Sequence, residues 1–172
     1  MEEPIKYRTS GASIARKKNH FYLFMNLSMA LILPALSILW DCIHEHENLN
    51  WELVGKWFIF YAVGIRLFTA GISQASNPAF TGSIFKMKTQ ESFVIIRELG
   101  FANIALGVMG VLSVLNNNWR ILAAIAGGLY LGFAGLQHLF KKSGSQNELI
   151  ALLYDLFALV VIGFYLSITL FF

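Results

Sequence analysis

The sequence predicts an all-α, polytopic membrane protein: a bundle of five transmembrane helices with its N-terminus inside and its C-terminus outside. Of its 172 residues, 56% are hydrophobic and 13% are charged, whereas a soluble domain carries about 25% charged residues. Five apolar runs each reach the roughly 20 residues that a helix needs to cross a bilayer. The lysines and arginines between these runs gather on one side, which is the usual orientation signal.

The expected helices form one domain, residues 20–172, after a basic tail, residues 1–19. The first run is too long for the apolar region of a signal peptide, so we expect it to stay as an anchor. The link 76–91 contains an Asn77-Pro78 turn signal, and we expect its later part at the membrane interface. Pro34 is expected to kink the first helix. The helices are predicted at 20–42, 53–75, 92–115, 120–140 and 149–171.

Orientation follows from the basic residues outside the runs. On the side opposite the tail the only one is Arg120, which is outnumbered there by glutamates. Because lysine and arginine accumulate in cytoplasmic loops, the tail is predicted to be cytoplasmic. The basic residues on the tail side are Lys6, Arg8, Arg16, Lys17, Lys18, Lys86, Lys88, Lys141 and Lys142.

Polar residues interrupt the helices at a similar depth. At 1.5 Å per residue, Glu98 and Asp155 each lie roughly 9 Å from the tail side. A charge at mid-membrane costs about 2.5–3.5 kcal/mol, so such groups normally face the bundle and find partners. We therefore expect Glu98 to point inward to Arg66 or His138, and Arg97 to pair with Asp155 or reach the head groups. The predicted network consists of Arg66, Arg97, Glu98, Asn103, His138 and Asp155.

The other half of the membrane is expected to be nearly free of polar groups, with Lys56 close enough to the surface to reach water. Small residues mark two helices, and such stripes permit close helix contact. Since a short polar turn, 116–119, joins the third and fourth helices, we expect these two to pack through their stripes. A homodimer seam on the fourth helix is the alternative. The stripes are Gly100, Asn103, Gly107 and Gly110, and Ala124, Gly128, Gly132 and Gly135.

No nucleophile elbow, phosphate-binding loop or zinc-protease motif is present, and the sequence predicts no catalytic residue and no metal site. A single cysteine, Cys42, excludes an intrachain disulfide. The loop 41–52 contains His44 and His46, which we interpret as part of a solvated loop. A metal held by Glu98, His138 and Asp155 is a weaker alternative on ligand type. The basic residues form no clustered face, so nucleic acid is not an expected partner.

The stretch "RELGFANIALGVMGVL", residues 97–112, resembles a family of small bacterial membrane proteins of unknown function. That family has a glutamate-x-glycine-x-x-asparagine pattern followed by spaced glycines, then a glycine- and alanine-rich run ending in histidine, like His138. Its last helix carries an aspartate, like Asp155. The resemblance covers residues 64–165 and implies the fold, the polar cluster apart from Arg66, and a bacterial inner membrane. "RLFTAGISQASNP" is more distantly similar to DoxX-like membrane proteins, some of which are subunits associated with oxidoreductases.

The leading hypothesis is a non-enzymatic integral membrane protein, an accessory or small-ligand-binding protein of the inner membrane. Its polar network is either paired architecture or a site for a ligand, a proton or a lipid head group. Two alternatives remain open: a small transporter or proton-coupled carrier, and a membrane enzyme acting on a lipid or quinone with His138 and Glu98 as acid and base. Membrane lipid, a second copy or a larger membrane complex are the expected partners, and the sequence indicates no particular cofactor.

Overall fold

The computed structural model describes residues 23–84, 89–140 and 146–171 of the chain. Within these residues, five helices are long and apolar enough to cross a membrane. This confirms an all-helical, multi-pass architecture, and the predicted boundaries agree with the observed ones to within a few residues. The nine basic residues that predict the orientation lie outside the described ranges. The five spans are Leu23–His44, Trp51–Ser76, Gln90–Leu112, Asn117–Phe140 and Leu149–Phe171.

Two spans contain a π-helical segment. The first span joins η1 (Ser28–Ile32) to α2 (Leu33–His44), and the second joins α3 (Trp51–Ile59), η2 (Phe60–Ile65) and α4 (Arg66–Ser76). Pro34 is the second residue of α2, two residues after the end of the first of these segments, so its missing N–H falls close to a stretch that has left the α-helical hydrogen-bond pattern. Arg66 directly follows the second.

The other spans are single α-helices: α6 (Gln90–Leu112), α7 (Asn117–Phe140) and α8 (Gln146–Phe171). Polar side chains cap the N-termini of α3 and α6. Asn50 accepts a hydrogen bond from the Leu53 amide, and Thr89 accepts one from the Ser92 amide. The link expected at the interface contains a short helix, α5 (Pro78–Ile84), which packs beside α4 and α6.

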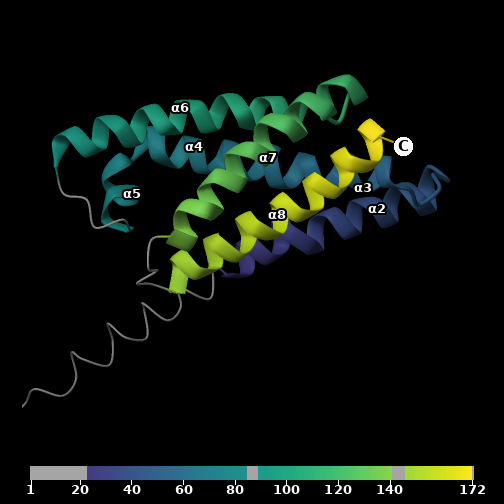
Figure 1. Ribbon diagram of the computed structural model, residues 1–172, viewed down its shortest axis with the longest axis horizontal. Helices are drawn as coiled ribbons and strands as arrows, with labels where there is room; N and C mark the ends of the chain where they lie inside the picture. The colour runs from purple at the N-terminus through teal and green to yellow at the C-terminus, as the bar shows by residue number, and fades with distance from the viewer. Residues whose placement is uncertain (1–22, 85–88, 141–145, 172) are drawn as a thin grey trace, which may run out of the picture.

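The second span lies at the centre of the bundle. Helix α6 runs along α4 and η2, whereas α7 crosses away from α6 and packs on α8, and the first span packs on α3 and η2 (Figure 1). Helices α6 and α7 meet mainly near the turn that joins them. The prediction that the third and fourth helices pack along their small-residue stripes is therefore wrong. We call the two ends of the bundle the Leu23 side and the Phe171 side, after the residues that begin and end the described spans.

The glycines explain this arrangement. A Cβ added at Gly110 would come within 2.6 Å of the Gly64 Cα, and one at Gly71 within 2.6 Å of the Gly100 oxygen. The second and third spans thus approach backbone to backbone, as small residues allow. The stripe on α7 faces α8, since a Cβ at Gly132 would meet Leu159. The stripe that we considered for a homodimer seam is covered within the same chain.

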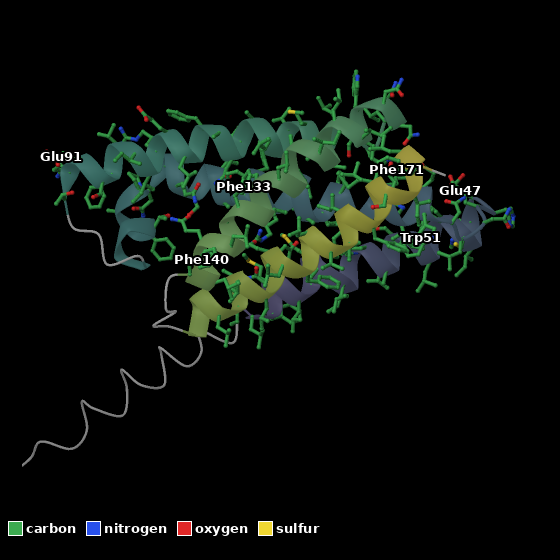
Figure 2. The ribbon with its side chains drawn as sticks, viewed as in Figure 1. Glu47, Trp51, Glu91, Phe133, Phe140 and Phe171 are labelled. Carbon is green, nitrogen blue, oxygen red and sulfur yellow. The ribbon has the colours of Figure 1, made fainter. Side chains whose placement is uncertain are left out.

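The outside of the bundle is apolar. Phe133, Phe140 and Phe171 stand on the surface with exposed fractions of 67%, 82% and 78% (Figure 2). A soluble monomer rarely carries so large a continuous apolar surface, whereas lipid is the matching solvent for it. The interior is filled by small, branched and aromatic residues, mainly of the second, fourth and fifth spans, such as Val63, Ala124 and Tyr165.

Candidate functional site

An ion pair inside the bundle joins the second and fifth spans. The Arg66 Nη2 atom lies 2.8 Å from the Asp155 Oδ1 atom, and the two side chains are 17% and 5% exposed. The Arg66 guanidinium also stacks over the Tyr154 ring, 3.9 Å from its centroid. Both charges are thus compensated away from water, as buried charges must be.

A second polar contact lies between the second and third spans. The Asn103 Nδ2 atom donates a hydrogen bond of 2.7 Å to the Gln74 Oε1 atom, and Asn103 is only 3% exposed. The Asn103 Oδ1 atom is buried without a hydrogen-bond partner among the described residues. Tyr130 of α7 lies near Asn103 and within electrostatic range of Arg66 and Asp155. Tyr130 therefore links the amide pair to the ion pair.

Four of the predicted network residues come together, and two do not. Arg66, Asn103 and Asp155 belong to the contacts above, and half-buried His138 interacts electrostatically with Asp155. Arg97 and Glu98 are exposed on α6, so the predicted inward Glu98 and the Arg97–Asp155 pair are both wrong. The reason is the rotation of α6 about its own axis. Gly100, Asn103 and Gly107 turn toward the second span, and steps of 100° per residue then direct Glu98 to the opposite side of the helix.

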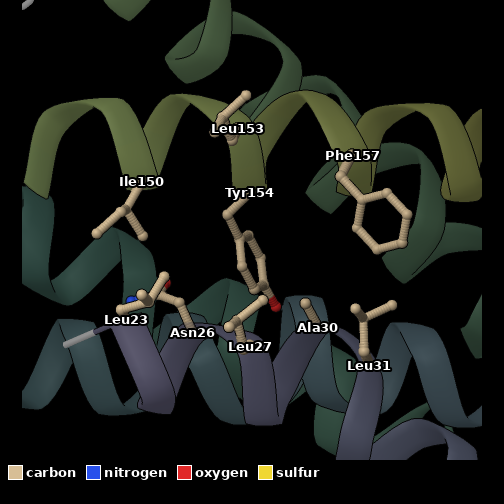
Figure 3. Close-up of a pocket in the computed structure, with 9 residues that line it drawn as sticks. All are labelled: Leu23, Asn26, Leu27, Ala30, Leu31, Ile150, Leu153, Tyr154 and Phe157. Carbon is tan, nitrogen blue, oxygen red and sulfur yellow. The ribbon is translucent and has the colours of Figure 1, made fainter. Parts of the chain in front are cut away.

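A groove of about 220 Å³ separates the first and fifth spans on the Leu23 side. Apolar side chains and Asn26 line it, and Tyr154 extends from α8 toward the first span, between Asn26 and Ala30 (Figure 3). The Tyr154 hydroxyl is buried and has no hydrogen-bond partner within the described part of the chain. Leaving a buried polar group unpaired costs about 1–3 kcal/mol. The groove is lined by Leu23, Asn26, Leu27, Ala30, Leu31, Ile150, Leu153, Tyr154 and Phe157.

The Phe171 side carries its own polar contacts, contrary to the expectation that this half is nearly bare. Asp41 accepts hydrogen bonds from Lys56 at 2.7 Å and from the Trp57 indole at 2.8 Å. Lys56 is therefore paired with the first span, whereas we expected it simply to reach water. Because Asp41 and Lys56 lie at similar distances from the connecting loop, a pairing between them was predictable from the sequence.

A second cluster on this side surrounds Arg120, which is 8% exposed. Its Nη1 atom lies 3.1 Å from the Glu52 Oε2 atom. Glu52 also accepts hydrogen bonds from Tyr165 at 3.4 Å and Thr169 at 3.2 Å. This cluster ties together the starts of the second and fourth spans and the end of the fifth. Residue types alone did not reveal it, because Arg120 and Glu52 each read as ordinary helix-end residues.

The described residues contain no group of three or more histidine, cysteine, aspartate or glutamate side chains arranged to hold a metal ion. The proposed triad of Glu98, His138 and Asp155 is not assembled in the structure, since Glu98 faces away from the other two.

The sequence analysis did not identify Tyr130 as part of the polar network. The feature that could have indicated it is its hydroxyl group, which stands alone within an otherwise apolar stretch of α7.

The match to a known family covers the whole described bundle. The family model described as "Family of unknown function (DUF6790)" matches residues 19–171. The chain belongs to this family. No curated protein and no solved structure matches the chain. Membership of DUF6790 agrees with the resemblance to a family of unknown function, and it extends over all five spans.

Proposed function

We propose that this DUF6790 protein is a non-enzymatic membrane protein that binds an amphipathic lipid in the groove between its first and fifth spans. The observation that carries the proposal is the Tyr154 hydroxyl, buried beside an apolar groove without a partner among the described residues. A lipid carbonyl or carboxylate that reaches this hydroxyl would accept its hydrogen bond. The lipid chain would cover the leucines of the groove.

The size and the walls of the groove support a chain-like occupant. Its volume of about 220 Å³ is below the roughly 300–1,000 Å³ of pockets that enclose a drug-sized ligand. One acyl or isoprenoid chain is a better fit than a compact solute. Leu27, Leu31 and Leu153 on its walls are 45%, 51% and 60% exposed, so in a membrane they face hydrocarbon. The ligand would therefore enter from the bilayer.

We expect Tyr154→Phe to lower lipid retention about fivefold, the equivalent of one net hydrogen bond of roughly 1 kcal/mol. Phenylalanine keeps the ring beneath Arg66 and removes only the hydroxyl. The measurement is crosslinking in nanodiscs that contain either a diazirine-bearing fatty acid or a phospholipid with a diazirine-bearing acyl chain. Labelled peptides are identified by mass spectrometry, and comparing the two probes separates a free carboxylate from an ester.

Two tryptophan variants control this experiment. Leu27→Trp fills the groove and should abolish labelling of its walls, whereas Leu39→Trp adds the same ring to the same span at an exposed position away from the groove and should change nothing. Equal labelling of wild type, Tyr154→Phe and Leu27→Trp would contradict the proposal. So would a wild-type protein whose groove residues are not labelled by either probe.

We further propose that the protein lies in a bacterial inner membrane with its Leu23 side in the cytoplasm. The sequence distribution of lysine and arginine supports this orientation. In a background lacking Cys42, a cysteine at exposed Asn118 should react with a membrane-impermeant maleimide in intact cells. A cysteine at exposed Gln90, on the other side, should react only after permeabilisation. The reverse pattern would contradict the orientation.

Two other functions stay predictions: a proton-coupled carrier, and a membrane enzyme acting on a lipid or quinone. A proton-coupled carrier would use the Arg66–Asp155 pair with His138, which are titratable groups within one cluster. The DoxX-like similarity, and with it an enzyme acting on a lipid or quinone, rests on the resemblance of the segment that begins at Arg66, residues 66–78. Of the acid and base proposed for that enzyme, Glu98 is exposed on α6 and His138 lies within the bundle. The groove therefore supports lipid binding better than it supports this chemistry.

A further inference from the structure

The outward face of α6 carries two charges that no other residue in the described ranges compensates. Arg97 and Glu98 are exposed, and neither forms an ion pair or hydrogen bond with any other residue that the structure describes. Glu98 lies eight residues after Gln90, roughly 12 Å along the helix. Charged groups at such depth normally pair with one another. Arginine can extend toward the head groups, but the shorter glutamate side chain reaches much less far.

The residues around these charges form a seam. Val94, Glu98, Phe101, Ala105, Val108 and Leu112 are spaced alternately four and three apart, and all are exposed. This is the spacing by which two helices pack with knobs in holes at a left-handed crossing, the commonest geometry in membrane bundles. Ala105 in the middle of the seam permits close approach. In this register Glu98 lies on the seam, and Arg97 flanks it directly.

We propose that two copies of the chain associate through this face of α6, with each Glu98 paired to Arg97 of the other copy. Both copies have the same orientation in the membrane, so the two helices are parallel and related by a two-fold axis. In knobs-into-holes packing, a seam residue enters a hole formed by four residues of the facing helix. For Glu98 that hole includes Arg97 of the second copy. The two-fold axis makes the contact reciprocal.

Charge complementarity selects a second copy as the occupant. The face carries one positive and one negative group at nearly the same depth, so an identical face supplies both missing partners at the correct depth. Each glutamate is then compensated without leaving the membrane. The groove between the first and fifth spans lies on other helices (Figure 1), so this interface is independent of the lipid-binding proposal.

The test uses charge reversal in full-length protein reconstituted in liposomes, with subunits counted by single-molecule photobleaching. Wild type should be dimeric. Arg97→Glu places only negative charges on the face and Glu98→Arg places only positive ones, so each variant alone should lose at least tenfold in dimer fraction. Coexpressed with different tags, the two variants should form a heterodimer, because one face then carries both acids and the other both bases. The double variant R97E/E98R should recover the homodimer.

Recovery of the dimer distinguishes a lost interface from a folding defect. Coexpression of the two single variants, or the double variant R97E/E98R, restores dimers only if the charges of one copy face those of the other. A wild-type protein that stays monomeric at high density in the bilayer would overturn the proposal. So would single variants that dimerise as wild type does, or a coexpressed pair that fails to associate. A wild-type protein that associates only with a different protein would likewise assign the face to that partner and exclude the second copy.

Discussion

Replacing Asp155 with leucine is expected to destabilise the folded protein by about 3–5 kcal/mol, because breaking one side of a buried ion pair leaves the other charge uncompensated. Here that charge is the Arg66 guanidinium, whose partner oxygen lies at 2.8 Å. Arg66 directly follows the π-helical segment in the middle of the central span, so its path to water is long. Arg66→Met should cost less, since the remaining carboxyl group can become neutral by taking up a proton.

The double variant R66M/D155L is the informative control. Replacing a buried ion pair by apolar residues of similar volume is often neutral or stabilising, so we expect stability near that of wild type. Unfolding is followed by heating or by added denaturing detergent in one fixed mild detergent. Ser167→Ala, which removes an exposed hydroxyl bonded to its own helix, should be indistinguishable from wild type. A double variant as unstable as Asp155→Leu would contradict this account of the pair.

The double variant also separates architecture from function. If it folds and still retains lipid in the crosslinking assay, the ion pair holds the second and fifth spans together and has no part in binding. If it folds but loses lipid, the guanidinium acts on the ligand through Tyr154, over which it stacks. The two hypotheses that the sequence left open for the network predict different results in this one measurement.

The depth of the polar groups was predictable from the sequence, but their rotation about each helix was not. Counting residues placed Asp155, Asn103 and His138 in one half of the membrane, and the structure brings them together with Arg66. Glu98 satisfied the same count and lies on the other side of its helix. Which face of α6 turns inward is decided by its neighbour, and the apolar residues around α6 give no preferred face.

The sequence also did not predict which helices pack against each other. Hydropathy identified all five spans, because a helix that crosses a bilayer needs about 20 mostly apolar residues, and such a run can be read directly from the sequence. Pairing depends on which small residues meet, and the short turn between the third and fourth spans indicated contact at one end only. Gly64 and Gly71 are the residues from which the pairing of the second and third spans could have been predicted. They lie seven residues apart on the second span, and in an antiparallel pair they meet Gly110 and Gly100.

Replacing Gly110 with valine should separate the second and third spans and destabilise the protein by about 1–3 kcal/mol or more, the cost of overpacking an interior. A Cβ at Gly110 would come within 2.6 Å of the Gly64 Cα and 2.8 Å of the Val63 carbonyl carbon. These are backbone atoms and cannot rotate away, so the helices themselves must move. The Asn103–Gln74 hydrogen bond, which crosses the same interface at 2.7 Å, should be strained or lost with them.

A graded series of glycine variants makes the reason for this effect measurable in the same unfolding assay. Gly132→Ala meets the Leu159 Cδ1 atom at 3.0 Å, the end of a flexible side chain, so its cost should be small. Gly163→Ala, with nothing within 4 Å of the added carbon, should match wild type or exceed it slightly because alanine favours the helix. An order of stability that followed helix propensity alone, with Gly110→Val at least as stable as wild type, would contradict backbone contact between the second and third spans. The order expected from the distances would establish that the third span is held by its glycines, which leaves its charged outer face free for another helix.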